Sequence, residues 1–199
     1  MWWTPTFLVR SYQLTVAQAG ELLGPMHLVA GTLGTLLASF LMSRPGAADP
    51  RNIARLLAWV TALTTLPSIL LFCVHSIETT RLLLWIFVPS VYFYIGPILG
   101  LLQNVVPAGM RATTCALLLF AANVANLVIA PQLIGWLSDW FAAHTYAGAE
   151  SLRWALLVLA PTGLWGVWHL SASRRTIYED SRSAAGVILD RSSSDDQKP

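Results

Sequence analysis

Polar side chains that could contact a bound molecule lie inside long apolar stretches of this sequence. They are His27, Tyr92, Gln103, Asn123 and Asn126. Imidazole, phenol and amide groups donate and accept hydrogen bonds, so each suits the polar part of a small solute. Because polar side chains are costly in hydrocarbon, they generally face protein or water there. We therefore take these five residues as candidate substrate-binding residues.

Helical spacing places the candidates on stripes together with small residues, and each stripe has two explanations. The first stripe fits close packing between two helices, with a cavity-facing His27 near its outer mouth as the alternative. The two asparagines lie one turn apart, and they fit a binding face and an interhelical hydrogen bond equally well. The stripes are Gly24, His27, Gly31, Gly34 and Ala38; Tyr92, Gly96, Gly100 and Gln103; and Ala116, Asn123, Asn126 and Ala130.

The elements that must position these residues are membrane-spanning helices. Of the 199 residues, 55% are hydrophobic and only 11% are charged, and the mean hydropathy is +0.59. An average chain has about a quarter of its residues charged, so this one cannot cover a soluble globule. Five stretches are long enough for a hydrocarbon core of about 30 Å. We expect them at residues 21–43, 54–75, 82–104, 112–137 and 153–172.

The arginines between these stretches predict the topology. Seven lie on one side of the predicted bundle and three on the other, and the richer side is expected in the cytoplasm. This places the C-terminus in the cytoplasm and indicates an integral protein of the bacterial inner (plasma) membrane. The richer side has Arg44, Arg51, Arg55, Arg111, Arg174, Arg175 and Arg182, and the other has Arg10, Arg81 and Arg153.

Two regions of different composition follow from this pattern. Residues 1–175 are expected to form a transmembrane helical domain. Residues 176–199 are dominated by Ser, Asp, Arg and Lys, which predicts a disordered cytoplasmic tail.

No enzyme motif is present in the sequence. The four histidines are scattered, there is no H-E-x-x-H or G-x-S-x-G pattern, and there is no glycine-rich phosphate loop. The carboxylates outside the tail fall at the ends of the apolar stretches or between them. We therefore predict no catalytic residue, no metal and no cofactor, and His27 is the one candidate proton carrier within a span.

Two stretches resemble the major facilitator superfamily. The sequence "VPAGMRATTCALLLFAANVANLVIAPQLIGWLSD", residues 106–139, is similar to the region of the tenth and eleventh helices, where a Pro-x-x-x-R loop leads into a helix ending in G-x-L-S-D. The sequence "WTPTFLVRSYQLTVAQAGELLG", residues 3–24, resembles the outer end of the seventh helix and the start of the eighth in the spinster-like and organic-anion branches.

The resemblance implies an all-α membrane protein: five transmembrane helices plus a truncated N-terminal helix, forming one half of a major-facilitator fold. It implies a secondary transporter of small organic solutes that works by alternating access. Its partners would be the lipid bilayer, a small-molecule solute and an N-terminal six-helix half in the same or a separate chain, with no nucleic acid. In that family the seventh, eighth, tenth and eleventh helices line the cavity, which places all five candidates on lining helices. The alternative is a truncated, non-transporting membrane protein that packs against a partner half.

Overall fold

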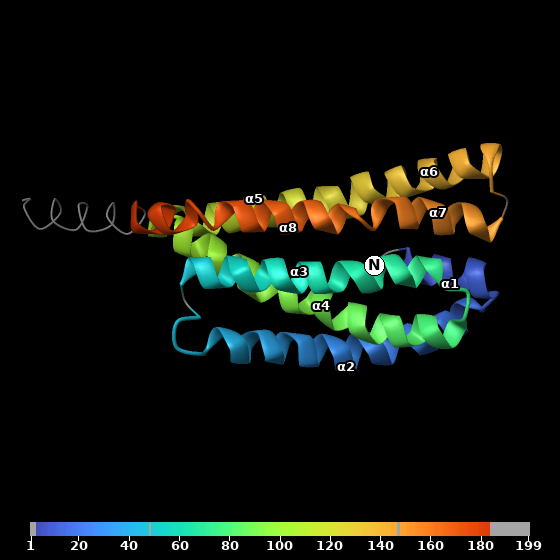
Figure 1. Ribbon diagram of the computed structural model, residues 1–199, viewed down its shortest axis with the longest axis horizontal. Coiled ribbons are helices and arrows are strands. Elements are labelled where there is room, and N and C mark those ends of the chain that lie inside the picture. The colour runs from blue at the N-terminus through green and yellow to red at the C-terminus, as the bar shows by residue number, and fades with distance from the viewer. Residues whose placement is uncertain (1–2, 48, 147, 184–199) are drawn as a thin grey trace, which may run out of the picture.

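The computed structural model describes residues 3–47, 49–146 and 148–183, and within these ranges it contains helices and no strand. Five helical stretches are long and apolar enough to cross a bilayer. They run lengthwise as rods, so the turns gather at the two ends of the molecule (Figure 1). The stretches are α2 (Val16–Met42), α3 (Pro50–Cys73), α4 (Ile77–Val105), a composite of four helical segments (Ala108–His144), and the pair α7 and α8 (Ala149–Ser173).

All five predicted spans are present, but each begins four or five residues before its predicted start. For α2 and α3 the apolar pattern missed the first turn because it contains polar residues and is fixed by a side-chain cap. Thr15 accepts a hydrogen bond from the backbone N–H of Gln18, whose side chain accepts one from the backbone N–H of Thr15 in return. Asp49 caps α3 by accepting from the backbone N–H of Arg51. Such caps satisfy backbone donors that have no partner inside the helix.

A short helix, α1 (Thr4–Tyr12), precedes the spans, as predicted. Pro5 lies in its first turn, and the helix ends where Gln13 adopts a left-handed conformation with φ of 54°. Phe7 and Leu8 are fully buried, and α1 contacts α2 and α7. A nine-residue helix is about 13 Å long, so α1 cannot cross a membrane alone.

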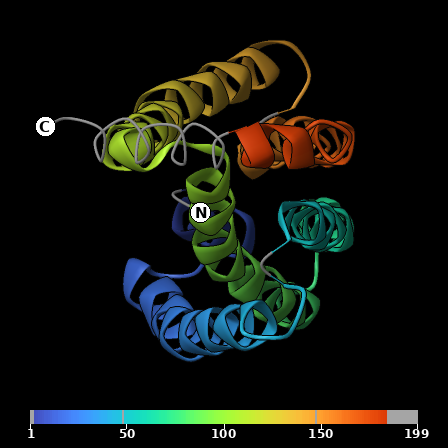
Figure 2. The same ribbon diagram turned by 90° about the vertical axis from the view of Figure 1, so that its left-hand side faces the viewer.

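Helix α4 is the central element of the bundle. It packs against α2, α3 and α5, and Figure 2 shows it between α2 on one side and α5 on the other. The approach to α2 is closest at two glycines of the first predicted stripe. A Cβ on Gly34 would lie 2.4 Å from the carbonyl oxygen of Pro89, and one on Gly31 would lie 3.1 Å from the ring of Tyr92. This stretch of the stripe is therefore a packing surface between helices.

The fourth span changes helical type along its length. Its segments are η1 (Ala108–Met110), α5 (Arg111–Asn123), η2 (Val124–Ile129) and α6 (Ala130–His144), of which η2 is a π-helix. The backbone N–H of Ala130 donates to the carbonyl of Ala125, five residues back. Pro131 follows directly, and its ring would clash with the carbonyl four residues before it in a regular α-helix. The wider π turn relieves this clash.

Two apolar clusters hold the bundle together, one near each end. The first joins α1, α2, α3 and α4, and the second joins α3, α4 and the segment after α8. Large apolar side chains also cover much of the outside, including Trp59, Trp136, Trp165 and Trp168. An apolar exterior of this kind suits lipid rather than water. The buried members are Leu8, Ala19, Leu23, Met26, Leu71 and Leu84 in the first cluster, and Ile53, Ala54, Leu57, Leu101 and Ile177 in the second.

The first residues of the predicted tail differ from the expectation of disorder. Residues 177–183 are helical, and Ile177 is 8% exposed because it packs against Ile53 and Leu57 of α3. One apolar residue in a polar sequence gave too weak a signal for this contact. The remaining part of the predicted tail, residues 184–199, lies outside the described residues.

Candidate functional site

His27 and Tyr92 form a pair between α2 and α4. The Nδ1 atom of His27 lies 2.9 Å from the Tyr92 hydroxyl oxygen, and the two rings meet edge to face with centroids 5.9 Å apart. Both side chains are half-buried, and both lie near the middle of their spans. The structure thus brings together two candidates that are 65 residues apart in the chain.

The pair lines a shallow groove of about 430 Å³ on α2. The hydroxyls of Thr32 and Thr35 also line it, but each donates its proton to a carbonyl of its own helix, at 2.7 and 2.9 Å. These hydroxyls are left as hydrogen-bond acceptors. The second ring nitrogen of His27 makes no hydrogen bond to a described residue, so it is available to a solute or to water.

Gln103 lies apart from this pair. It is exposed near the last turn of α4, eleven residues beyond Tyr92, which corresponds to about 16 Å along the helix. Its Nε2 atom lies 3.9 Å from the Sγ of Cys115 on α5. Tyr92 and Gln103, the two candidate residues of the second predicted stripe, therefore lie at different depths.

The two asparagines differ in what they contact. The Nδ2 of Asn123 donates to the carbonyl of Leu119 in its own helix at 2.8 Å, so its amide makes no interhelical bond among the described residues. Asn126 lies on the π-helical segment η2, and its side chain makes no hydrogen bond to any described residue. It lines a cavity of about 620 Å³ between α3, α4 and the fourth span. Within this cavity Asn126 faces a space shared with Tyr94, a residue that sequence reasoning missed.

This cavity is mainly apolar and lies at the middle of three spans. Its lining includes the hydroxyls of Thr61, Thr64 and Ser90, each of which donates to a carbonyl of its own helix. The lining residues of α4 occupy a face next to the one that carries Tyr92. Helix α4 thus separates two hollows, one containing the His27–Tyr92 pair and the other containing Asn126.

A buried arginine that the sequence placed among the topology-marking loop charges belongs to a helix instead. Arg153 lies in α7 (Ala149–Leu159) and is 4% exposed. Its Nη1 atom donates to the carbonyl of Phe72 at 3.3 Å and to that of Val74. These are the last carbonyls of α3, which carry partial negative charge. Arg153 therefore joins the fifth span to the end of the second.

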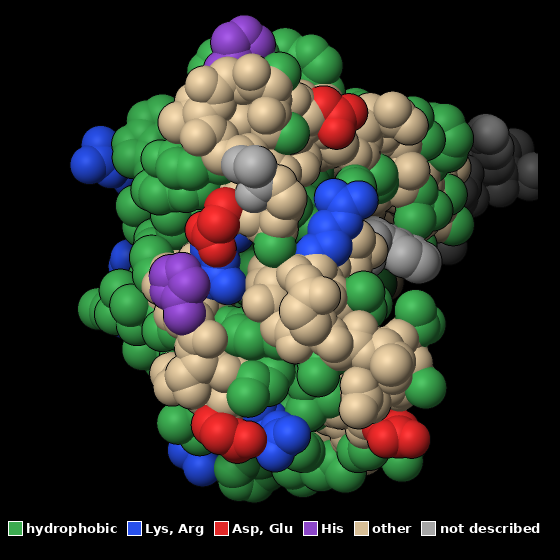
Figure 3. Space-filling view, turned by 90° about the vertical axis from the view of Figure 1, so that its right-hand side faces the viewer, with side chains coloured by type: hydrophobic (Ala, Val, Ile, Leu, Met, Phe, Trp, Pro, Cys, Tyr) green, Lys and Arg blue, Asp and Glu red, His purple; other side chains and the backbone are tan. Residues whose placement is uncertain are grey.

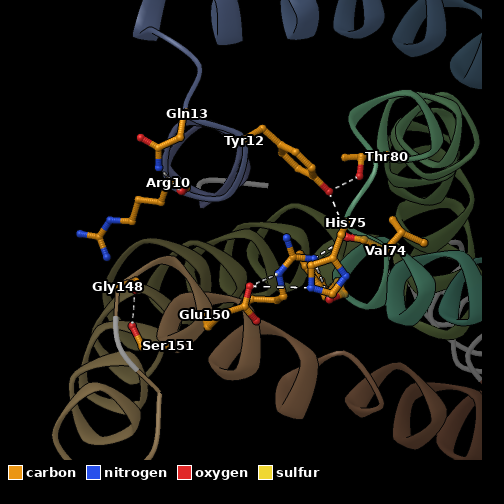
Figure 4. A network of polar contacts seen from close by, with 11 residues as sticks. Arg10, Tyr12, Gln13, Val74, His75, Thr80, Gly148, Glu150 and Ser151 are labelled. Atoms are coloured by element: carbon orange, nitrogen blue, oxygen red, sulfur yellow. Dashed lines mark hydrogen bonds and ion pairs between the residues drawn. The ribbon is translucent and has the colours of Figure 1, made fainter.

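Neighbouring side chains complete this corner of the molecule (Figure 4). Glu150 forms an ion pair with the Nε of Arg153 at 3.3 Å and approaches the Nε2 of His75 at 3.8 Å. The Tyr12 hydroxyl donates to the carbonyl of Val74 at 3.1 Å. The guanidinium also lies 5.8 Å from the Tyr12 ring centroid, in cation–π range. The only sequence signal for this network was the Glu150 to Arg153 spacing of three residues.

The carboxylates of the described residues lie at or beyond the ends of the spans. Glu21 and Glu150 occupy the first two turns of their helices, and Asp139 lies in the last two turns of α6. Among the described residues no group of three or more His, Cys, Asp or Glu side chains could hold a metal ion. The polar groups at mid-depth are therefore imidazole, phenol, hydroxyl and amide.

These features define the class of the molecule, an all-α membrane protein with uncharged polar residues at the middle of adjacent spans. Comparison with known proteins gives a narrower assignment than this class. The chain is 30% identical over 188 residues to an MFS-type efflux pump of Mycolicibacterium smegmatis, and the match covers 90% of this chain and 42% of that protein. No family model matches the sequence. The similarity supports membership of the major facilitator superfamily, and together with the apolar helices it supports an integral membrane protein. The chain spans less than half the length of the pump.

Proposed function

We propose that the chain forms the C-terminal half of a major-facilitator secondary transporter that moves small organic solutes by alternating access. The observation that carries the proposal is the similarity to an efflux pump over 188 residues, which covers 90% of this chain. The position of polar residues at the middle of α2, α4 and η2 supports it, because transporter sites of this kind lie near the bilayer midplane. The chain then acts by binding and conformational change and not as an enzyme.

The solute contacts in this proposal are hydrogen bonds from neutral groups. His27 and Tyr92 offer them from one side of α4, and Asn126 offers one from the other. Asn123 joins this set if its amide releases the Leu119 carbonyl, and Gln103 would act nearer the end of the path. No described arginine lies at mid-depth, so the proposal favours solutes bound without an anion-selecting cation.

Topology, branch and partner are part of the same proposal. The arginine-rich end of the bundle, where α2 meets α3, and the C-terminus face the cytoplasm of a bacterial inner membrane. The resemblance of residues 3–24 favours the spinster-like or organic-anion branch. An N-terminal six-helix half, in the same or a separate polypeptide, completes the cavity. The fourth span supports such a partner, because its most apolar window buries none of its residues within the described chain.

A non-transporting membrane component is the second candidate. The same unburied fourth span favours it, since a half-protein that only packs against a partner would present this surface too. In that case the chain would assemble with a partner half and move no solute by itself.

Transport assays with matched variants test these proposals. The chain, alone and co-reconstituted with the N-terminal half of the similar pump, is placed in proteoliposomes, and movement of a panel of small fluorescent organic dyes is followed. We expect Asn126→Ala and Tyr92→Phe to reduce dye movement, and Asn104→Ala, an exposed amide at the end of α4, to leave it unchanged. Dye movement in neither preparation would favour the non-transporting component. Equal rates in all variants would remove these residues from the site.

A further inference from the structure

The two ends of the helical bundle carry different charge. In the described ranges, the end where α2 meets α3 has seven arginines and three carboxylates, and the opposite end has three arginines and four carboxylates, mixed on one face (Figure 3). We call the first the basic end. Its charged residues are Arg44, Arg51, Arg55, Arg111, Arg174, Arg175 and Arg182, with Asp49, Glu179 and Asp180.

Ion pairing increases the difference in unpaired positive charge between the two ends. The ion pairs of the described chain all lie at the opposite end, and they involve Glu78, Glu150 and their partners. At the basic end no described carboxylate lies within 4.0 Å of a guanidinium nitrogen, although Asp49 accepts from the backbone N–H of Arg51. The positive charge of this end is therefore available to an outside anion.

The ring of Tyr178 lies within cation–π range of two of these arginines. The guanidinium carbon of Arg51 lies 4.1 Å from the Tyr178 ring centroid, and that of Arg182 lies 6.0 Å from it. Ile177 fixes this segment against α3. A guanidinium above a ring keeps the N–H groups at its edge free, and two such groups near one another favour a shared phosphate.

Along the exposed face of α3, the residues that follow these cations are arranged in the same order as the parts of a phospholipid. Arg51 and Arg55 lie one turn apart and are exposed, and Trp59 lies one turn further and is 70% exposed. Leu63 and Leu66 follow on the outside, at 74% and 62% exposure. Cations, then an amphipathic aromatic ring, then aliphatic side chains match a headgroup, a glycerol region and an acyl chain.

We propose that the outer face of α3 binds an anionic phospholipid of the leaflet next to the basic end. Arg51, Arg55 and Arg182 contact its phosphate, Trp59 lies beside the glycerol, and Leu63 and Leu66 contact an acyl chain. The apolar stripe below the arginines favours a lipid over a free phosphate, because a free phosphate would use only the cations.

Lipid titration of the full-length chain tests the proposal. The purified protein in detergent is titrated with phosphatidylglycerol, with phosphatidylcholine of the same acyl chains, or with inorganic phosphate, and bound lipid is counted by native mass spectrometry. We expect tighter binding of phosphatidylglycerol than of phosphatidylcholine. Arg51→Gln/Arg55→Gln should weaken phosphatidylglycerol binding about fivefold for each arginine removed and weaken phosphatidylcholine binding less, because choline already offsets the phosphate charge of that lipid. Arg81→Gln, an exposed arginine at the opposite end, is the matched control.

The outcomes separate lipid binding from its alternatives. Equal binding of the two lipids, or unchanged phosphatidylglycerol binding in the double variant, overturns the proposal. Full competition by inorganic phosphate at equal concentration also overturns it, because the site would then recognise a free anion. Circular dichroism checks that the variant folds, and a salt titration of the wild-type chain gives a second measurement. Raising the ionic strength should weaken its phosphatidylglycerol binding, and no change would contradict the proposal.

Discussion

The contact between α2 and α4 predicts a graded response to alanine at three glycines of one helix. At Gly34 an added Cβ would lie 2.4 Å from the backbone oxygen of Pro89, about 1 Å inside an ordinary contact of 3.4 Å. A backbone oxygen cannot rotate away, so the two helices must separate. At Gly31 the added atom would meet the Tyr92 ring at 3.1 Å, and at Gly20 it would meet nothing within 4 Å.

The magnitudes follow from two opposing effects. Alanine in place of glycine stabilises a helix interior by up to about 1 kcal/mol, and this gain is shared by all three variants. Overpacking costs about 1–3 kcal/mol, and it applies fully only at the closest contact. We expect Gly20→Ala to be neutral or stabilising by up to about 1 kcal/mol, Gly31→Ala to be near neutral, and Gly34→Ala to lower the free energy of unfolding by about 1–2 kcal/mol.

Unfolding in mixed micelles measures the series. Each variant is titrated with denaturing detergent, and the loss of helical circular dichroism gives the free energy of unfolding. A Gly34→Ala variant as stable as Gly20→Ala would refute the close α2–α4 approach.

Three further perturbations give distinct readouts in the same preparation. Arg153→Met should lower the free energy of unfolding by about 2–3 kcal/mol because it leaves the α3 terminal carbonyls short of a donor, whereas Arg81→Met should stay within about 0.5 kcal/mol; equal effects would contradict the buried network. Tyr92→Phe should cost about 1 kcal/mol by removing the hydrogen bond to His27, and an unchanged stability would argue against the pair. Pro131→Ala should slow hydrogen exchange of the amides in 124–130, since a regular α-helix can then replace the π turn; unchanged exchange would show that proline does not cause it.

The sequence predicted the spans well because a bilayer imposes a simple rule on composition. The starts of α2 and α3 were misplaced because Thr15 and Asp49 cap these helices from polar turns outside the apolar window. The small-residue stripe also predicted packing at Gly34, where spacing alone carries the information. A hydropathy pattern cannot predict where a helix begins when a side-chain cap sets its first turn.

The candidate site was less accessible to prediction. Spacing placed His27 and Tyr92 on stripes of two helices, but their contact depends on how α2 and α4 are aligned along their length. The change to a π-helix rotates Asn126 relative to Asn123. A pattern based on 3.6 residues per turn cannot predict this rotation. Arg153 seemed to be a loop charge because its partners are backbone carbonyls, and these leave no trace in side-chain patterns.

The bond between Arg153 and the end of α3 also imposes an order on biosynthesis. The two partners are about 80 residues apart, so a ribosome completes α3 and the next two spans before the arginine emerges. Until then the carbonyls at that helix end lack their cationic donor, and the corner between α1, α3 and α7 stays open. The fifth span therefore closes a joint that began with the second.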